Sequence, residues 1–173
     1  MAGSLDKEEH PHLLAPGRHR MSMKDLRTRC VELFPQSSTR QLLFLTLERL
    51  VAALGAKGLA CEIWVDGSFV TEKPNPADID LTVVFHGAEL DRLARDDRDA
   101  AIDLLAMERD GRFRPDLHLF MAALRPAGHP DHAALTGMLD YWAQWWSVTR
   151  ENWVKGFAVV KLGESDVAVR ILP

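Results

Sequence analysis

Cysteine is scarce in this chain: only Cys30 and Cys61 occur among its 173 residues. They form no Cys-x-x-Cys pair, which argues against a disulfide framework and against a structural zinc site. Long hydrophobic runs are also missing, since no segment reaches the roughly 18–20 apolar residues that cross a bilayer. Residues 1–20 are polar and lack the apolar centre of a signal peptide. We therefore expect a soluble, cytoplasmic protein with no membrane contact.

A positive charge excess is absent as well, because the net charge is -4 and the isoelectric point is near 6.0. Proteins that bind long nucleic acids usually carry a basic surface, so polymer binding is not the leading expectation. A single dense basic run lies near the start of the chain, and a solvated helix face explains it better than an RNA contact. Its members are Arg18, Arg20, Lys24, Arg27 and Arg29.

Several well-known catalytic motifs are missing. The chain has no Gly-x-x-x-x-Gly-Lys-Ser/Thr loop and no Gly-x-Gly-x-x-Gly after a strand, which argues against P-loop and dinucleotide-binding proteins. Ser68 lies in Gly-Ser-Phe and not in a Gly-x-Ser-x-Gly elbow, so a serine hydrolase is poorly supported. A metal-dependent hydrolase remains open, because water can replace another acceptor in the same displacement.

Two aspartates, Asp78 and Asp80, alternate along a predicted strand at residues 78–85. Side chains two positions apart on a strand point to the same side, so both carboxylates aim at one spot. Paired Mg²⁺ ions bridge the attacking and leaving oxygens in nucleotidyl transfer, and Mg²⁺ takes carboxylates together with substrate phosphates as ligands. The spacing therefore predicts a site for two Mg²⁺ (or Mn²⁺) ions.

A Gly-Ser turn, Gly67-Ser68, ends the preceding predicted strand at residues 60–66. Glycine lets the backbone approach a phosphate closely, and a short helix opened by Ser68 would present free N–H groups and a hydroxyl. Lys73 follows where its charge could neutralise a triphosphate, although loop lysines are commonly solvated. Alone, an Asp-Gly turn or an aspartate at a strand start is ordinary surface structure. Together and in this order, they predict a phosphate site facing a metal site.

Gly67-Ser68, a nine-residue spacer and Asp78-Ile79-Asp80 resemble the signature of the DNA polymerase β-like nucleotidyltransferase superfamily. Residues 15–19, 66–74 and 154–157 further resemble a group of small, stand-alone bacterial members. The resemblance implies transfer of a nucleoside monophosphate from a nucleoside triphosphate (NTP) to an acceptor, with Gly67 and Ser68 holding the β- and γ-phosphates. The acceptor, whether protein, RNA or small molecule, is not identified.

The superfamily also uses a third carboxylate on a later strand, and residues 114–121 are the best candidate strand because apolar side chains alternate there. Asp116 is therefore expected to complete the metal site and to assist deprotonation of the acceptor. His118 would share the face of Asp116 and approach the acceptor or a phosphate. The alternatives are a surface aspartate at a strand start and a half-exposed histidine.

The length suits one α+β domain, a mixed sheet of the nucleotidyltransferase type braced by helices. We expect a flexible N-terminal arm at residues 1–16 and a single domain at 17–173, with its core at about 37–125 and a C-terminal helix and strands at about 130–173. Hydrophobic periodicity and capping residues predict its elements. Helices are expected at about 22–34, 38–54, 88–107 and 130–148, and further strands at 157–162 and 167–172.

The last predicted helix carries Trp142, Trp145 and Trp146 within five residues. These rings could stack on a base, but core packing or a surface for another chain, including a second copy of this one, is the favoured use. This leads to a second hypothesis, a non-catalytic nucleotide-binding module acting as an antitoxin-like or phage-defence partner. The presence of all three expected carboxylates favours the enzyme.

Overall fold

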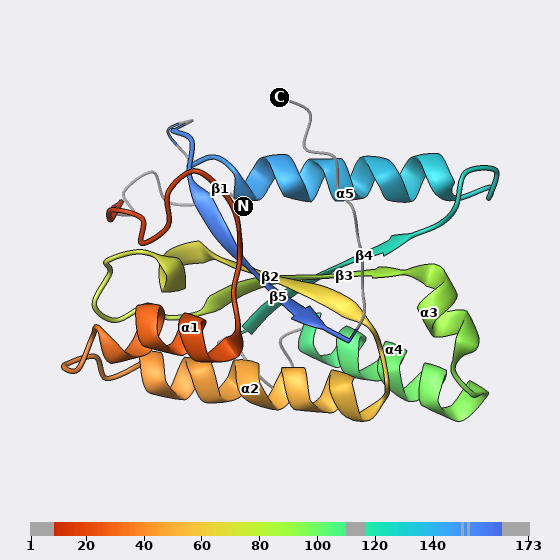
Figure 1. The fold of residues 1–173 in the computed structure, drawn as a ribbon, viewed down its shortest axis with the longest axis horizontal. Helices are drawn as coiled ribbons and strands as arrows, with labels where there is room; N and C mark the ends of the chain where they lie inside the picture. The colour runs from red at the N-terminus through yellow and green to blue at the C-terminus, as the bar shows by residue number, and fades with distance from the viewer. Residues whose placement is uncertain (1–8, 110–116, 150, 152, 164–173) are drawn as a thin grey trace.

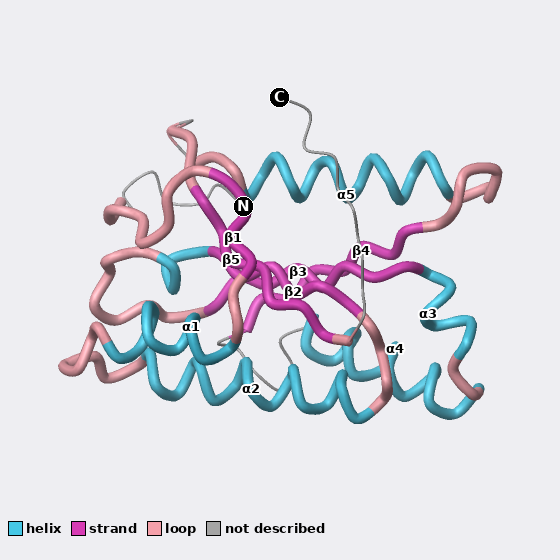
Figure 2. Tube along the Cα trace, in the orientation of Figure 1, coloured by secondary structure: helices cyan, strands magenta, loops and turns pink. Residues whose placement is uncertain are grey.

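The fold is built on a five-stranded mixed sheet with the strand order β1-β5-β2-β3-β4. The computed structural model describes residues 9–109, 117–149, 151 and 153–163. Figure 2 shows the strands running through the middle of the molecule. Their bounds are β1 (Gly17–Arg20), β2 (Cys61–Asp66), β3 (Ile79–His86), β4 (Leu117–Leu124) and β5 (Gly156–Leu162). The pairs β1–β5 and β3–β4 are parallel, whereas β2 is antiparallel to both of its neighbours.

Helices cover both faces of this sheet, which confirms the α+β class. α1 (Met23–Arg27), α2 (Arg40–Ala56) and α4 (Arg95–Arg109) lie on one face, and α5 (His132–Trp146) lies on the other (Figure 1). The short α3 (Gly87–Arg92) follows β3 directly. The sheet is therefore the middle of three layers, and its two faces have separate cores.

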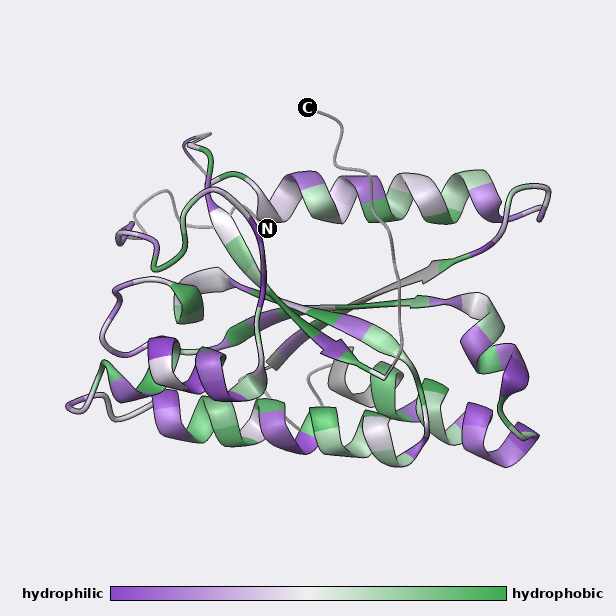
Figure 3. Cartoon of the chain, viewed as in Figure 1, coloured by the Kyte–Doolittle hydropathy of each residue, from purple (hydrophilic) through white to green (hydrophobic). Residues whose placement is uncertain are grey.

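The alternation of side chains along β2 creates these two cores. Ile63 and Val65 point toward α1, α2 and α4, together with Leu26, Leu47 and Leu105. Trp64 points toward α5 and packs with residues of that helix and of β5. This second core contains Trp64, Val84, Leu139, Ala143, Trp146, Phe157 and Val159. Figure 3 shows the hydrophobic colour along the crossing strands, between the helical layers.

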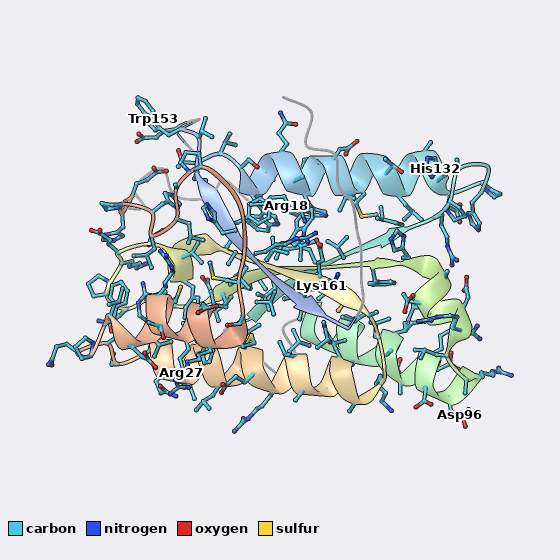
Figure 4. All side chains as sticks on the ribbon, in the orientation of Figure 1. Arg18, Arg27, Asp96, His132, Trp153 and Lys161 are labelled. Carbon is cyan, nitrogen blue, oxygen red and sulfur yellow. The ribbon has the colours of Figure 1, made fainter. Side chains whose placement is uncertain are left out.

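β1 was not expected as a strand, and a buried charge cluster explains how this polar segment docks beside β5. Arg18 donates to Glu62 Oε2 at 2.5 Å, and Trp64 Nε1 donates to the same oxygen at 3.0 Å. The Arg18 guanidinium also lies 4.8 Å from the centre of the Trp64 ring. Figure 4 shows Arg18 between α5 and the sheet. Because Glu62 is fully buried, it needs these donors.

Most predicted elements are present, with differences at their ends. Ser22 caps the first helix with a capping box, but α1 ends at Arg27 and continues as a π-helical turn (Thr28–Glu32). The helix predicted at 88–107 is instead divided between α3 and α4, with a break at residues 93–94. The strand predicted at 167–172 lies outside the described residues.

Part of the expected N-terminal arm packs against the domain. His12 forms an antiparallel bridge with Thr71, and Leu13 N–H donates to the Val70 carbonyl at 3.0 Å. Leu14 is buried in the core of the α2 side. Residues 11–14 therefore lie beside the turn that follows β2. No helix in the described part of the chain has the length and apolar character needed to span a membrane.

Candidate functional site

A row of polar side chains crosses three neighbouring strands at the end of β2. Asp66 on β2 is the register partner of Asp80 on β3, and Asp80 is in turn the partner of His118 on β4. Register partners on neighbouring strands share one face of the sheet. The next row, Trp64, Thr82 and Phe120, lies beneath α5, where Trp146 Nε1 donates to Thr82 Oγ1 at 2.7 Å. The polar row therefore begins beside the C-terminal end of α5.

Asp78 and Asp80 come together as the sequence predicts. Their side chains are 23% and 25% exposed, so both carboxylates reach solvent although Asp80 sits on a central strand. His118 Nδ1 lies 3.3 Å from Asp80 Oδ1 and 3.8 Å from Asp78 Oδ2. Burial and the nearby Asp78 raise the pKa of Asp80, whereas His118 acts in the opposite direction. This concentration of negative charge is the condition that a divalent cation relieves.

Gly67 brings the backbone against this carboxylate pair. It follows β2 directly and opens a 3₁₀ turn (Gly67–Val70) with a φ of +75°, in the left-handed region that glycine adopts without steric cost. A Cβ atom built at this position would overlap Asp80 Oδ2 and lie 3.0 Å from Asp80 Cγ. Conformation and space therefore both require glycine here. The Asp80 carboxylate explains the need for glycine, and the approach of a phosphate to this backbone stays a prediction.

Ser68 and Lys73, the other two expected nucleotide-binding residues, have different positions. Ser68 is half-buried in the 3₁₀ turn, and its carbonyl accepts bonds from the Thr71 amide and hydroxyl. Lys73 is also half-buried, and its carbonyl accepts a hydrogen bond from Arg40 at 2.6 Å. The contacts described for Lys73 involve its backbone, and they do not join it to Asp78 or Asp80. Asp116, the expected third carboxylate, lies outside the described residues.

Sequence reasoning missed Lys155, which is buried beside the row. Its ammonium donates to Asp66 Oδ2, and the two residues lie 89 positions apart in the chain. Burial raises the pKa of Asp66 to about 6, while Lys155 and the Gly67 backbone amide oppose this rise. Burial lowers the pKa of His12, and the charge of Lys155 acts in the same direction. Residues 154–157 belong to the resemblance, but no local pattern indicates a partner for Lys155.

Arg40 was also missed, and it fixes the chain that follows Gly67. Although fully buried, it pairs with no carboxylate among the described residues and instead donates to four carbonyl oxygens at 2.6–2.7 Å. Its guanidinium stacks 3.8 Å from the centre of the Phe34 ring, and burial lowers its pKa to about 10. The accepting carbonyls belong to Cys30, Phe69, Thr71 and Lys73. Arg40 therefore ties the turn and the following loop to the helical layer.

The donor set suits Mg²⁺ in part. Asp78 and Asp80 are adjacent, partly exposed carboxylates, and Gly67 leaves the Asp80 carboxylate unobstructed by a side chain. No group of three or more His, Cys, Asp or Glu side chains that could hold a metal occurs among the residues that the structure describes. Two carboxylates fit a cation that takes its remaining ligands from substrate phosphates and water. Asp78 and Asp80 therefore fit a Mg²⁺ ion, and Asp116 is the expected third ligand.

Comparison with known proteins identifies one family. No curated protein matches the chain, and no solved structure does. A family described as "Family of unknown function (DUF6932)" matches residues 6–161. The match covers most of the chain and includes the Gly67 turn, Asp78, Asp80 and Lys155. The chain therefore belongs to this family of unknown function, DUF6932.

Proposed function

We propose that this protein is a metal-dependent nucleotidyltransferase that moves a nucleoside monophosphate from an NTP to an acceptor. The observation that carries the proposal is the contact geometry of Gly67. A left-handed glycine at the end of β2 leaves no space for a side chain beside Asp80, while Asp78 and Asp80 remain partly exposed. A glycine with this constraint, next to a carboxylate pair, suits a site where phosphates and cations must approach closely.

Metal binding and phosphate binding are assigned to different residues of the site. Asp78 and Asp80 would hold two Mg²⁺ ions, which when bound would offset the charge of the triphosphate and of the attacking oxygen. Gly67 and Ser68 would contact the β- and γ-phosphates. The acceptor oxygen forms a bond to the α-phosphorus, the bond from that phosphorus to the bridging oxygen breaks, and pyrophosphate leaves. Asp116 remains the candidate that assists loss of the acceptor proton.

A direct test follows label from each of four α-phosphate-labelled NTPs, with Mg²⁺ or Mn²⁺, into cell-lysate protein, RNA and small molecules. We would compare the wild-type protein with Asp80→Asn, which removes a charge but keeps the shape. Asp97→Asn is the matched control, because Asp97 is 56% exposed and pairs with Lys57 on the surface. Mutation of residues that hydrogen-bond to metal ligands typically lowers activity about 10–100-fold, so loss of a ligand itself should lower the rate of transfer at least about 100-fold. Transfer that persists in folded Asp80→Asn would contradict the proposal.

A second candidate is the nucleotide-binding module that acts through a protein partner, in an antitoxin-like or phage-defence role. The outer face of α5 favours it, because Tyr141 and Trp145 are 51% and 55% exposed and their rings stack at 5.8 Å. Metal-dependent NTP binding without pyrophosphate release would support this candidate against the enzyme. We propose a cytoplasmic location for either function. The free, buried thiols of Cys30 and Cys61 support it, because a reducing compartment keeps cysteines in this form.

A further inference from the structure

Lys155 joins three parts of the molecule next to the candidate site. It immediately precedes β5, and its side chain is 10% exposed. Its ammonium pairs with Asp66 and lies 5.8 Å from the centre of the Trp146 ring. Its amide donates to the Ser147 carbonyl at 2.8 Å, and its carbonyl accepts from the Gly17 amide at 3.3 Å. The end of β2, the end of α5 and the start of β1 therefore all meet at this lysine.

The backbone that carries Lys155 has little freedom to move. A Cβ atom built at the next residue, Gly156, would overlap the Ala15 carbonyl oxygen and approach the His19 ring at 3.1 Å. His19 Nε2 lies 2.7 Å from the same carbonyl oxygen. This close packing holds residues 155 and 156 against the N-terminal segment. The Lys155 side chain therefore extends toward Asp66 from a closely packed backbone.

Two consecutive residues, Asp66 and Gly67, connect Lys155 to Asp80. Lys155 holds the Asp66 carboxylate, and Asp66 also interacts with the backbone amide of Gly67. Gly67 in turn lies so close to Asp80 that no side chain fits between them. The other oxygen of Asp66, Oδ1, is buried and accepts no hydrogen bond from the residues that the structure describes. Lys155 is thus the strongest described partner of the residue that leads into the left-handed turn.

Stability is a weak explanation for this ion pair. Taking two charges out of water costs free energy that their attraction often does not recover, and apolar residues of similar size can serve as well. Asp66 is fully buried, and it stands at the one point of β2 where the chain must turn into a left-handed conformation. A buried pair at such a point is explained by geometry, because each charge fixes the place of the other.

We propose that Lys155 is a positioning residue for nucleotide binding: by holding Asp66, it fixes the turn at Gly67 and so places the polyphosphate relative to Asp80. The proposal rests on the nucleotidyltransferase function. It predicts that loss of Lys155 weakens nucleotide binding more than metal binding, because Asp80 lies on β3, Asp78 immediately precedes this strand, and both aspartates keep their contact with His118.

The test uses the full chain, four single variants and one double variant. Mn²⁺ binding without nucleotide would be followed by electron paramagnetic resonance, and binding of each of the four NTPs with Mn²⁺ by calorimetry. Lys155→Met removes the charge at similar length, Lys155→Arg keeps it, and Asp80→Asn removes the expected metal ligand. The matched control is Lys57→Met, because Lys57 also pairs with an aspartate, Asp97 at 3.4 Å, but on the surface. Circular dichroism would check that each variant is folded.

The expected result has three parts. Lys155→Met raises the Kd for the nucleotide at least tenfold and changes Mn²⁺ affinity less than threefold. Lys155→Arg restores nucleotide affinity to within threefold of the wild type, and Lys57→Met behaves as the wild type. Unchanged nucleotide affinity in Lys155→Met, or failure of Lys155→Arg to restore it, would overturn the role of Lys155 while Asp80-dependent Mn²⁺ binding still supported the enzyme. Mn²⁺ binding that does not depend on Asp80 would instead overturn the proposed function, and this proposal with it.

The variant Lys155→Met leaves the Asp66 carboxylate buried without its cation, and this change alone could prevent folding. The double variant with Lys155→Met and Asp66→Asn removes both charges and avoids that outcome. We expect it to fold, to bind Mn²⁺ as the wild type does and to bind the nucleotide at least tenfold more weakly. Wild-type nucleotide affinity in the folded double variant would overturn the proposal.

Discussion

Gly67→Ala should be far more damaging than an ordinary glycine substitution, because two costs act together. A residue with a side chain in the left-handed conformation costs about 1–2 kcal/mol, and Gly67 has a φ of +75°. The new methyl group would also overlap Asp80 Oδ2, and forcing an extra carbon into a packed position typically costs about 1–3 kcal/mol. We therefore expect the free energy of unfolding to fall by about 2–5 kcal/mol. Urea denaturation followed by circular dichroism measures this change.

Gly58→Ala separates the two costs. Gly58 follows α2 and has a φ of +67°, but a Cβ atom built there has no neighbour within 4 Å. Gly58→Ala should therefore lower the free energy of unfolding only by the cost of the left-handed conformation, about 1–2 kcal/mol. The benefit of a less flexible unfolded chain is common to both substitutions. The difference between the two variants, about 1–3 kcal/mol, is the cost of the overlap with Asp80.

Asp80→Ala provides the second half of the experiment. Without the carboxylate, the methyl group at position 67 loses its two closest neighbours, Asp80 Oδ2 and Cγ. Asp80 Cβ, at 3.2 Å, remains in the alanine variant, so Gly67→Ala should then cost little more than Gly58→Ala does. The coupling between positions 67 and 80 should account for most of the cost of the overlap. Equal destabilisation by Gly67→Ala and Gly58→Ala in the wild-type background, or a coupling near zero, would refute the close approach from which the function is argued.

Two further predictions concern the buried charges around the turn. Arg40→Lys should lower the free energy of unfolding by about 3–5 kcal/mol in urea denaturation, because an ammonium cannot serve four carbonyl oxygens in the plane of a guanidinium; a loss below about 1 kcal/mol would contradict this network. For Asp66, burial raises the pKa to about 6, above the value near 3.9 in an unfolded chain. The folded protein therefore keeps the Asp66 proton to higher pH than the unfolded chain does. The contribution of this proton to the free energy of unfolding is fully present below about pH 4 and is lost as the pH rises through 6. Asp66→Asn should lack this loss when denaturation is measured from pH 4 to 7, and parallel curves for the two proteins would contradict the burial of an ionisable group.

The sequence predicted the elements whose signals are local. β2 and β3 begin and end within about a residue of their predicted positions, because apolar alternation and the flanking turn residues mark them. α2 follows the predicted apolar periodicity, although it extends to Ala56, two residues past its predicted end. The meeting of Gly67 with Asp80 was also predictable, since a single antiparallel pairing brings the ends of two consecutive strands together.

The parts that could not be predicted depend on contacts between distant segments. Lys155 reaches Asp66 only because β5 inserts beside β2, and nothing near residue 155 indicates that neighbour. Arg40 looks like an ordinary polar residue at the start of a helix, and its burial arises from the loop that wraps around it. β1 has no apolar alternation of its own, and its Arg18 pairs with Glu62, which lies 44 positions away on β2. Local propensity carries no information about such tertiary contacts.

The strand order also determines when the site can be assembled during synthesis. β5 lies between β1 and β2, so the first strand has no place in the sheet until the last described strand has arrived. Residues 17–20 leave the ribosome more than a hundred residues before their partners at 156–159. Such long sequence separation slows folding, because a large loop must close before the contact forms. The hairpin of β2 and β3 can form early, whereas Lys155 and the N-terminal segment close over it only after β5 has been synthesised.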